Sequence, residues 1–347
     1  MGQVRKILIC PDSFKGTMTA LESAEVMAEG AREALPEAEI TLLPLGDGGE
    51  GTIAALAGAL PQVSEVRVQT VDALRRPIEA SYIISNGNTA LIEAAAASGL
   101  TMIGAEERDI MRADTYGTGL LIADAWRRGI NRFIVGMGGT ATCDGGIGAL
   151  EAMQTVMKPY GGAEGLQMTL LCDVKNPLCG PEGAAAVFGP QKGATPAMIP
   201  ILDARLAERA EEYARGGGIN VRDKKYAGAA GGLAGMLMAC YGAEARQGIA
   251  EVLELLDFDR RVIGADLVIT GEGRGDLTTL NGKAPRGVLD AAGRHGVPVA
   301  LVCGCIADGE ALREAGFRHV VSASRAGAAE QPQDSLRKAV RSMLRRR

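Results

Sequence analysis

The order of predicted elements in the first 52 residues constrains the fold most strongly. The apolar run Lys6 to Cys10 predicts a strand, and Thr19-x-x-Glu22 is a capping box that begins a helix ending before Pro36. A second apolar run, 40–45, leads into the glycine-rich segment 46–52 (GDGGEGT), after which 53–60 predicts a helix. Strand, helix and strand in this order form a βαβ unit, which requires a parallel sheet covered by helices.

The same alternation of strands and helices is predicted near the end of the chain, and it is less regular in the middle. After residue 265 we expect strands at 266–270, 297–303 and 318–322, and helices at 282–295 and 308–315. The middle predicts strands near 66–71, 80–84, 89–93, 130–135 and 169–172, and helices at 115–128 and 195–215. The sequence therefore predicts an α/β protein in which residues 1–72 and 262–347 form a discontinuous domain. A second α/β domain, 73–261, is inserted into it.

Composition supports this class and excludes others. Aromatic residues make up 3% of the chain while 47% is hydrophobic, so the core must consist of Ala, Val, Ile and Leu. The net charge of −5 argues against a nucleic-acid partner, which would require a basic face. The sequence has no apolar run of about 18 residues and no secretory signal pattern, so we expect a cytoplasmic protein without a membrane partner. The seven cysteines are expected to be buried small residues.

Five loops combine glycine with charge where strands are predicted to end: 11–16, 46–52, 138–146, 189–195 and 270–283. In an open α/β sheet, loops at the carboxyl ends of strands converge on one crevice. Lysines and glycine amides suit phosphate, and carboxylates suit Mg²⁺. Phosphoryl transfer needs both, because its catalysis consists mainly of positioning and charge neutralisation. Any one loop could be a surface turn, but five inert turns are much less expected. Their charged residues are Lys15, Lys192, Lys283, Arg274, Asp12, Asp47, Glu50, Asp144, Glu272 and Asp276.

Other enzyme classes find weaker support. Gly282-Lys283 lacks the upstream glycine of a P-loop and is followed by Ala284. The segment Gly136-x-Gly138-x-x-Ala141 approaches a dinucleotide fingerprint, but 143–146 (CDGG) is expected to continue the loop where that fingerprint requires a helix. The two histidines lie at a helix end and a strand start, so a histidine-based nucleophilic triad is disfavoured.

Nine separated motifs then resemble the bacterial glycerate kinase family, type 1. They are 9–16 (ICPDSFKG), 47–52 (DGGEGT), 93–100 (EAAAASGL), 115–119 (TYGTG), 138–146 (GGTATCDGG), 172–177 (CDVKNP), 187–195 (VFGPQKGAT), 228–233 (GAAGGL) and 268–273 (VITGEG). The motifs follow the family's order over nearly the whole chain. Thr140 and Cys143 stand where Ser and Asn are usual, and the segment 150–169 is shorter than in typical members.

The resemblance implies a kinase that phosphorylates D-glycerate with ATP and Mg²⁺, usually to 2-phosphoglycerate. It also implies a Rossmann-like or flavodoxin-like domain carrying the inserted one, with the active site in the cleft between them. The protein would be a monomer or homodimer. The expected catalytic residues are Asp47, Lys15, Asp173 and Lys192. The expected substrate and phosphate ligands are Asp12, Ser13, Gly48, Gly49, Glu50, Ser98, Gly138, Gly139, Thr140, Asn176, Gly271, Gly273, Arg274 and Lys283. The expected Mg²⁺ ligands are Glu272 and Asp276.

Asp47 is the candidate that orients or deprotonates the attacking hydroxyl, and Asp173 is its alternative. Two other functions remain open from the sequence. One is a kinase for a related small hydroxy acid, enabled by the shorter segment 150–169 in the inserted domain, or a kinase that forms 3-phosphoglycerate. The other is a nucleotide or metabolite sensor without catalysis.

Overall fold

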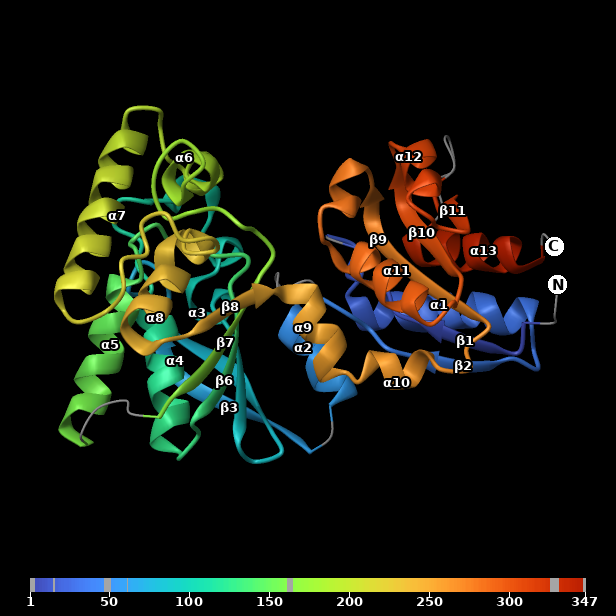
Figure 1. The fold of residues 1–347 in the computed structure, drawn as a ribbon, viewed down its shortest axis with the longest axis horizontal. Helices are drawn as coiled ribbons and strands as arrows, with labels where there is room; N and C mark the ends of the chain where they lie inside the picture. Colours follow the sequence, from blue (N-terminus) through green and yellow to red (C-terminus); the bar gives the residue numbers. More distant parts are fainter. Residues whose placement is uncertain are drawn as a thin grey trace. The chain divides into compact units, whose positions relative to one another are not determined.

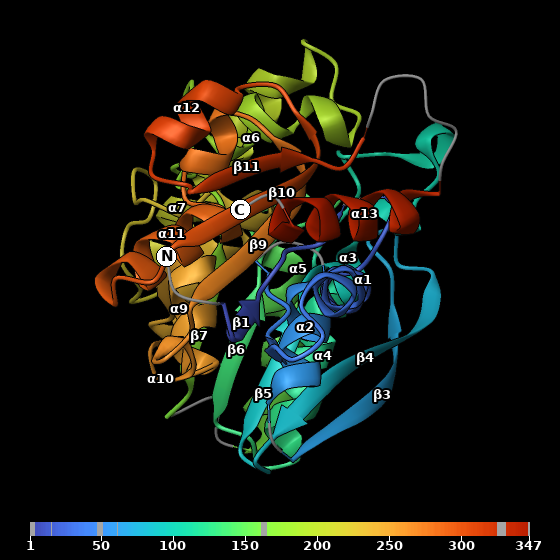
Figure 2. The same cartoon turned by 90° about the vertical axis from the view of Figure 1, so that its right-hand side faces the viewer.

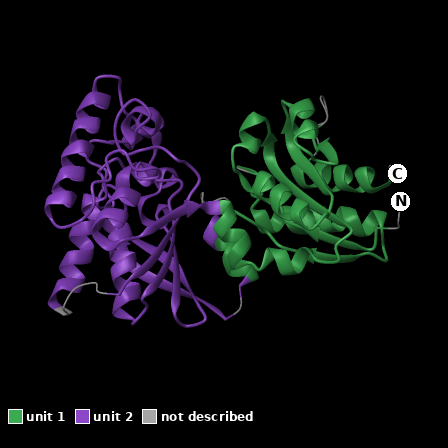
Figure 3. Ribbon diagram, viewed as in Figure 1, with its two compact units in different colours: residues 1–47, 54–59, 249–347 green, residues 48–53, 60–248 purple. Residues whose placement is uncertain are grey.

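The computed structural model describes residues 4–14, 16–46, 51–60, 62–160, 165–324 and 331–345. The chain divides into two compact units (Figures 1 and 3). Unit 1 comprises residues 1–47, 54–59 and 249–347, and unit 2 comprises 48–53 and 60–248.

Unit 1 contains a five-stranded parallel sheet in the order β11-β10-β9-β1-β2. Read from β2, this order matches the flavodoxin-like arrangement 2-1-3-4-5, in which the chain changes direction between β1 and β9. The α/β class and the flavodoxin-like domain are therefore confirmed. Its strands are β1 (Lys6–Ile9), β2 (Glu39–Leu42), β9 (Leu267–Gly275), β10 (Val299–Ile306) and β11 (His319–Ser322). Its helices are α1 (Ala20–Ala34), α2 (Thr52–Ala59), α9 (Gly248–Leu255), α10 (Phe258–Val262), α11 (Ala284–Arg294), α12 (Gly309–Glu314) and α13 (Pro332–Arg345), with the 3₁₀ helix η6 (Leu277–Leu280).

Helices cover both faces of this sheet, with α1 and α13 on one face and α11 on the other (Figure 2). In β1, Ile7, Leu8 and Ile9 are all buried, which is the pattern of a strand covered on both faces. The predicted capping box at Thr19 is confirmed: its side chain accepts from the Glu22 N–H, and the Glu22 carboxylate accepts from the Thr19 N–H.

Unit 2 contains a six-stranded mixed sheet in the sequential order β3-β4-β5-β6-β7-β8. The pairs β3–β4 and β4–β5 are antiparallel, and the pairs from β5 to β8 are parallel. Its strands are β3 (Val63–Val71), β4 (Pro77–Ser85), β5 (Thr89–Glu93), β6 (Arg132–Gly136), β7 (Gln167–Cys172) and β8 (Glu244–Gln247). Its helices are α3 (Ala95–Ser98), α4 (Tyr116–Arg127), α5 (Ile147–Met157), α6 (Ala184–Phe188), α7 (Met198–Arg215) and α8 (Leu233–Tyr241), with the 3₁₀ helices η4 (Pro190–Lys192) and η5 (Ala229–Gly232).

The unit boundaries differ from the predicted domain boundaries, by one strand at the first boundary and by two helices at the second. The predicted boundary after residue 72 assigns β3 to the first domain, whereas β3 pairs with β4 along its whole length and belongs to unit 2. The predicted boundary after residue 261 assigns α9 and α10 to the inserted domain, whereas residues from 249 onward belong to unit 1. Pairing between strands decides the first boundary, and single-sequence patterns do not reveal it.

The segment 227–235 does not form one continuous helix. Ala230 and Gly231 adopt left-handed backbone conformations inside η5, with φ of 52° and 63°. A Cβ at Gly231 would lie 1.9 Å from the Thr142 carbonyl oxygen, so only glycine permits this approach. The irregular backbone therefore brings η5 against the loop that follows β6.

Candidate functional site

A small cavity lies in unit 2 where the parallel strands β6 and β7 end. Its volume is about 120 Å³. The residues after β6 and β7 meet there because the carboxyl ends of parallel strands share one edge of the sheet. The lining residues are Leu100, Met137, Gly138, Gly139, Thr140, Asp173, Val174, Phe188, Gln191, Lys192, Ala230 and Gly231. The structure thus brings together five of the predicted site residues: Gly138, Gly139, Thr140, Asp173 and Lys192.

Lys192 contributes a buried ammonium group to this cavity. It ends η4, and only 5% of the residue is exposed. Its Nζ donates to the Thr142 carbonyl oxygen at 2.8 Å and to Thr140 Oγ1 at 3.2 Å. An ammonium has three N–H donors, and these two bonds use two of them. Lys192 can therefore hold the loop after β6 and still offer a donor to a ligand.

Burial changes the acid–base behaviour of Lys192. It lowers the pKa of the ammonium group from 10.5 to about 8, while Asp144 and Asp173 oppose this by favouring the charged form. A lysine with a pKa of about 8 is mostly protonated at neutral pH and loses its charge in mildly alkaline solution. The site therefore carries a positive charge at pH 7 that can attract a carboxylate or a phosphate.

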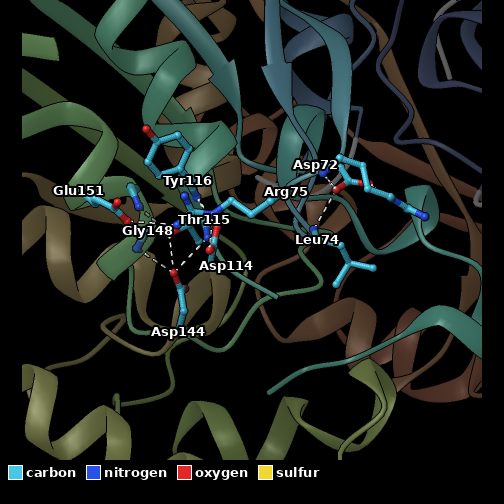
Figure 4. A network of polar contacts seen from close by, with 11 residues as sticks. Asp72, Leu74, Arg75, Asp114, Thr115, Tyr116, Asp144, Gly148 and Glu151 are labelled. Carbon is cyan, nitrogen blue, oxygen red and sulfur yellow. Dashed lines mark hydrogen bonds and ion pairs between the residues drawn. The ribbon is translucent and has the colours of Figure 1, made fainter. Parts of the chain in front are cut away.

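Asp144 has a structural task that the sequence did not indicate. Its carboxylate accepts hydrogen bonds from the Thr115 N–H and hydroxyl and from the N–H groups of Gly146 and Gly148 (Figure 4). These donors belong to the starts of α4 and α5, so one carboxylate caps two helices. The expectation that 143–146 continues the loop is confirmed, since α5 begins only at Ile147, and Asp144 within that loop caps the helix.

A second set of contacts holds the turn between β3 and β4 against the same helices (Figure 4). The Arg75 guanidinium lies 3.9 Å from the centre of the Tyr116 ring, and it binds Asp114 at 2.7 Å and Glu151 at 3.1 Å. Such contacts place the start of α4. These contacts support the scaffold of unit 2.

Two predicted ligands in unit 2 have side chains that form contacts within the unit. Ser98 is fully buried, and its Oγ lies 2.7 Å from Thr118 Oγ1. The Asn176 amide donates to the Glu182 carbonyl oxygen at 2.7 Å. Neither residue is among the described residues that line the cavity. Ser98 still acts on the site through its backbone, since its carbonyl oxygen accepts from the Ala141 N–H beside Thr140.

Unit 1 gathers polar groups at the carboxyl ends of β1 and β9, between which the chain changes direction. The Asp12 N–H donates to the Gly271 carbonyl oxygen at 2.9 Å, which joins the segment after β1 to β9. A Cβ at Gly271 would lie 2.2 Å from the Val302 carbonyl oxygen, so this glycine is required for close packing of β9 on β10. In flavodoxin-like sheets this switch point is where ligands bind.

Glu272 and Lys283 form a partly buried ion pair at this switch point. Lys283 Nζ lies 3.3 Å from Glu272 Oε2, and the Glu272 side chain is 8% exposed. Glu272 Oε1 is buried and has no hydrogen-bond partner among the described residues. Burial raises the pKa of Glu272, and Thr279 and Lys283 oppose that change. A buried carboxylate oxygen without a partner can bind a ligand donor or a cation at little further cost in desolvation.

Asp276 is less suited to bind a metal directly. Its Oδ1 accepts from the N–H and hydroxyl of Thr278 as the cap of η6, and its Oδ2 lies 3.1 Å from Arg274 Nε. In the described residues, no group of three or more His, Cys, Asp or Glu side chains is arranged to hold a metal ion. Asp276 therefore orders the loop and engages Arg274, and Glu272 is the better candidate.

The other predicted residues divide into two groups. Ser13 and Gly273 lie at the same carboxyl edge of unit 1, where the Ser13 N–H donates to Asp12 Oδ1 at 2.7 Å. The remaining five lie outside the described residues, so their expected roles stay predictions: Lys15, Asp47, Gly48, Gly49 and Glu50.

Comparison with known proteins places these sites in a family. The sequence profile of the glycerate kinase family matches residues 7–164 and 161–346. The chain belongs to the glycerate kinase family. It is 41% identical to the glycerate kinase of Bacillus subtilis, over 90% of this chain and 88% of that protein. It is 40% identical to the glycerate 2-kinase of Escherichia coli K12, over 87% and 86%. The fold is also similar to a crystal structure of a protein provisionally named glycerate kinase 2 from Salmonella typhimurium LT2, with a TM-score of 0.84 and 37% sequence identity. The match covers 99% of this chain and 97% of the Salmonella chain.

Within this family member, the structure adds residues that the sequence did not single out. Gln191 and Gly231 line the cavity beside Lys192. The Arg108 guanidinium donates to the Gln191 carbonyl oxygen at 3.4 Å and so supports the loop that carries Lys192. Gln191 could have been found from its place in the 189–195 motif. Arg108 could not, because 83 residues separate it from Gln191.

Proposed function

We propose that this enzyme transfers the γ-phosphoryl group of ATP to the 2-hydroxyl of D-glycerate, giving 2-phosphoglycerate and ADP. The observation that carries the proposal is the identity of about 40% with the glycerate kinases of Bacillus subtilis and Escherichia coli, the second of which is named a glycerate 2-kinase. The identity extends over nearly nine tenths of each chain.

The size of the unit 2 cavity supports the proposal that glycerate binds there. A water molecule occupies about 30 Å³ in the liquid, so a cavity of about 120 Å³ has the volume of roughly four waters. That volume suits a three-carbon hydroxy acid and is too small for a nucleotide. We assign the glycerate carboxylate to Lys192, whose third N–H donor can form a charge-assisted hydrogen bond with it.

A carboxylate is also needed to orient the attacking hydroxyl. The 2-hydroxyl oxygen would attack the γ-phosphorus in line, the bond to the β-phosphate oxygen would break, and the hydroxyl proton would pass to the carboxylate. Asp47 remains the first candidate from the sequence. Asp173 is the alternative, supported by its place in the lining of the cavity that also contains Lys192.

We assign the nucleotide phosphates to the site in unit 1 at the carboxyl ends of β1 and β9. Lys283 would neutralise phosphate charge. Glu272 Oε1, which has no hydrogen-bond partner in the part of the chain that the structure describes, fits a contact with Mg²⁺, directly or through a water. Mg²⁺ usually keeps several waters and binds one or two carboxylates together with substrate phosphates, so a single protein carboxylate is sufficient. Bound there, the ion would neutralise charge that develops on the transferred group.

A coupled assay of ADP release over a panel of hydroxy acids, with ATP and Mg²⁺, tests the proposal. D-glycerate should give the highest kcat/KM of the panel, well above L-glycerate, lactate and glycolate. Turnover of another acid at a higher kcat/KM than D-glycerate would contradict the substrate assignment. ATP binding without ADP release from any acid would contradict the enzyme assignment.

A further inference from the structure

A large basic groove follows the outer edge of the unit 1 sheet. Strand β11 ends the strand order, so among the described residues one of its edges pairs with no other strand. The groove runs along β11 and is bounded by α12 and α13, which flank the strand in Figure 2. Its volume is about 770 Å³, roughly six times that of the unit 2 cavity. We call it the β11 groove.

The groove is positively charged although the protein as a whole carries a net charge of −5. Arg313 of α12, Arg318 before β11, and Lys338 and Arg341 of α13 contribute four cations, and His319 adds a titratable ring. None of the described residues that line it is acidic. Arg341 is bound by Glu33 of α1 at 2.8 Å, and Arg318 and Lys338 each take part in a further polar or electrostatic contact, so these three charges are partly compensated. Cations from both walls therefore face one concave surface.

The remaining lining suits a bound small molecule. Two hydroxyl groups, from Ser335 and Ser342, can donate to phosphate oxygens, whereas the Ser322 hydroxyl donates to the carbonyl oxygens of Gly304 and Ser324. Val320 and Val321 provide an apolar surface. Volumes of about 300–1,000 Å³ are typical of small-molecule sites. An added peptide strand is a weaker fit, because β11 has only four residues and short edges offer few ladder hydrogen bonds.

We propose that the β11 groove is a second anion-binding site, which binds a phosphorylated metabolite of about nucleotide size away from the phosphoryl-transfer residues. It lies at the sheet edge, two strands from β9, which carries Glu272. The proposal does not depend on the proposed function, because it concerns binding at groups that the transfer reaction does not use.

The chain offers a specific probe of the groove, because it contains two histidines only. His319 lines the groove, whereas His295 lies at the end of α11 with its Nε2 2.7 Å from Asp259 Oδ1. We would label histidine isotopically in the full chain and follow both rings by NMR at constant ionic strength while titrating tripolyphosphate. A saturable shift of the His319 resonances is expected, with His295 unchanged.

Matched double variants distinguish binding in the β11 groove from non-specific attraction of the anion to positive charge elsewhere on the protein. R313Q/K338Q removes one cation from each wall and should weaken tripolyphosphate binding about tenfold or more, since hydrogen bonds to charged groups are strong. R32Q/R260Q removes two exposed arginines of unit 1 outside the groove and should bind as the wild type does. Thermal unfolding of both variants verifies that they fold.

Three results would overturn the proposal: no shift of His319, equal shifts of both histidines, or unchanged affinity in R313Q/K338Q. A hexaglutamate peptide is titrated in parallel. Saturable binding of the peptide without binding of tripolyphosphate would likewise overturn it, in favour of a protein partner. Repeating the titration with K192M separates the two proposals, because the His319 response should persist whether or not that variant retains activity.

Discussion

Replacing Lys192 by methionine removes one buried charge and keeps the length of the side chain. If Lys192 binds the glycerate carboxylate, the lost attraction can be estimated for two unit charges about 4 Å apart. With an effective dielectric constant of about 20, that attraction is about 4 kcal/mol. Because each 1.36 kcal/mol changes a rate by about tenfold, kcat/KM for glycerate should fall by about a thousandfold.

The effect on stability should be much smaller, which makes the kinetic result interpretable. The variant loses the hydrogen bonds to the Thr142 carbonyl oxygen and Thr140 Oγ1, but it also removes a desolvated charge. These contributions oppose each other, so the free energy of unfolding at pH 7 should change by no more than about 2 kcal/mol.

The pH dependence gives an independent check on Lys192. Substrate binding needs its protonated form, so kcat/KM of the wild type should fall as pH rises through about 8. For stability, the folded-state pKa lies below the unfolded value. The unfolded chain therefore holds more protons between about pH 8 and 10.5, and the wild type gains stability relative to K192M across that range. The lowered pKa of Lys192 corresponds to a rise of up to about 3 kcal/mol in the free energy of unfolding of the wild type relative to K192M.

The assay is steady-state ADP release with glycerate varied, together with urea unfolding at several pH values. K158M is the matched control, because Lys158 is an exposed lysine of unit 2 away from the cavity. A kcat/KM for K192M within about threefold of the wild type, in a folded protein, would refute the role assigned to Lys192.

Three further predictions use other positions. G119A should lower the free energy of unfolding in urea by about 2 kcal/mol or more, because the new Cβ would lie 2.6 Å from Ala149 Cα. G293A should raise it by about 0.5–1 kcal/mol, because a Cβ at Gly293 has no heavy atom within 4 Å. A G119A protein more stable than G293A would contradict the packing of α4 on α5. S98A should cost about 1 kcal/mol of stability and leave KM for glycerate within about twofold, so a large rise in KM would restore Ser98 as a ligand. E272Q should raise the Mg²⁺ concentration for half-maximal activity about tenfold or more, and an unchanged Mg²⁺ dependence would remove Glu272 from the metal assignment.

Local signals in the sequence predicted most of the elements correctly. The capping box at Thr19 and the apolar runs of β1, β9 and β10 depend on neighbouring residues, and the structure confirms them. Strand β8 was not predicted, because its alternation over four residues includes Glu244 and Arg246 and is too short to distinguish from a loop. The helical nature of 147–157 was missed because Asp144 caps α5 together with α4, a contact that depends on the fold.

The candidate site was predicted as a set of residues and not as a geometry. Lys192 and Thr140 were both named from their motifs, but the bond between them spans 52 positions and follows from the meeting of β6 and β7. The role predicted for Ser98 as a substrate ligand stays a prediction, and its burial could not be foreseen because a motif does not distinguish a buried hydroxyl from an accessible one. The cleft between the domains, the oligomeric state and the cytoplasmic location stay predictions.

The position of the phosphate in the product tests the central claim most directly. Purified enzyme would be incubated with ¹³C-labelled D-glycerate, ATP and Mg²⁺, and the product identified by ³¹P and ¹³C NMR. We predict 2-phosphoglycerate, recognised by coupling of phosphorus to the C2 carbon. Phosphorus coupled to C3, or glycerate that remains unmodified while the protein is folded and binds ATP, would contradict the account.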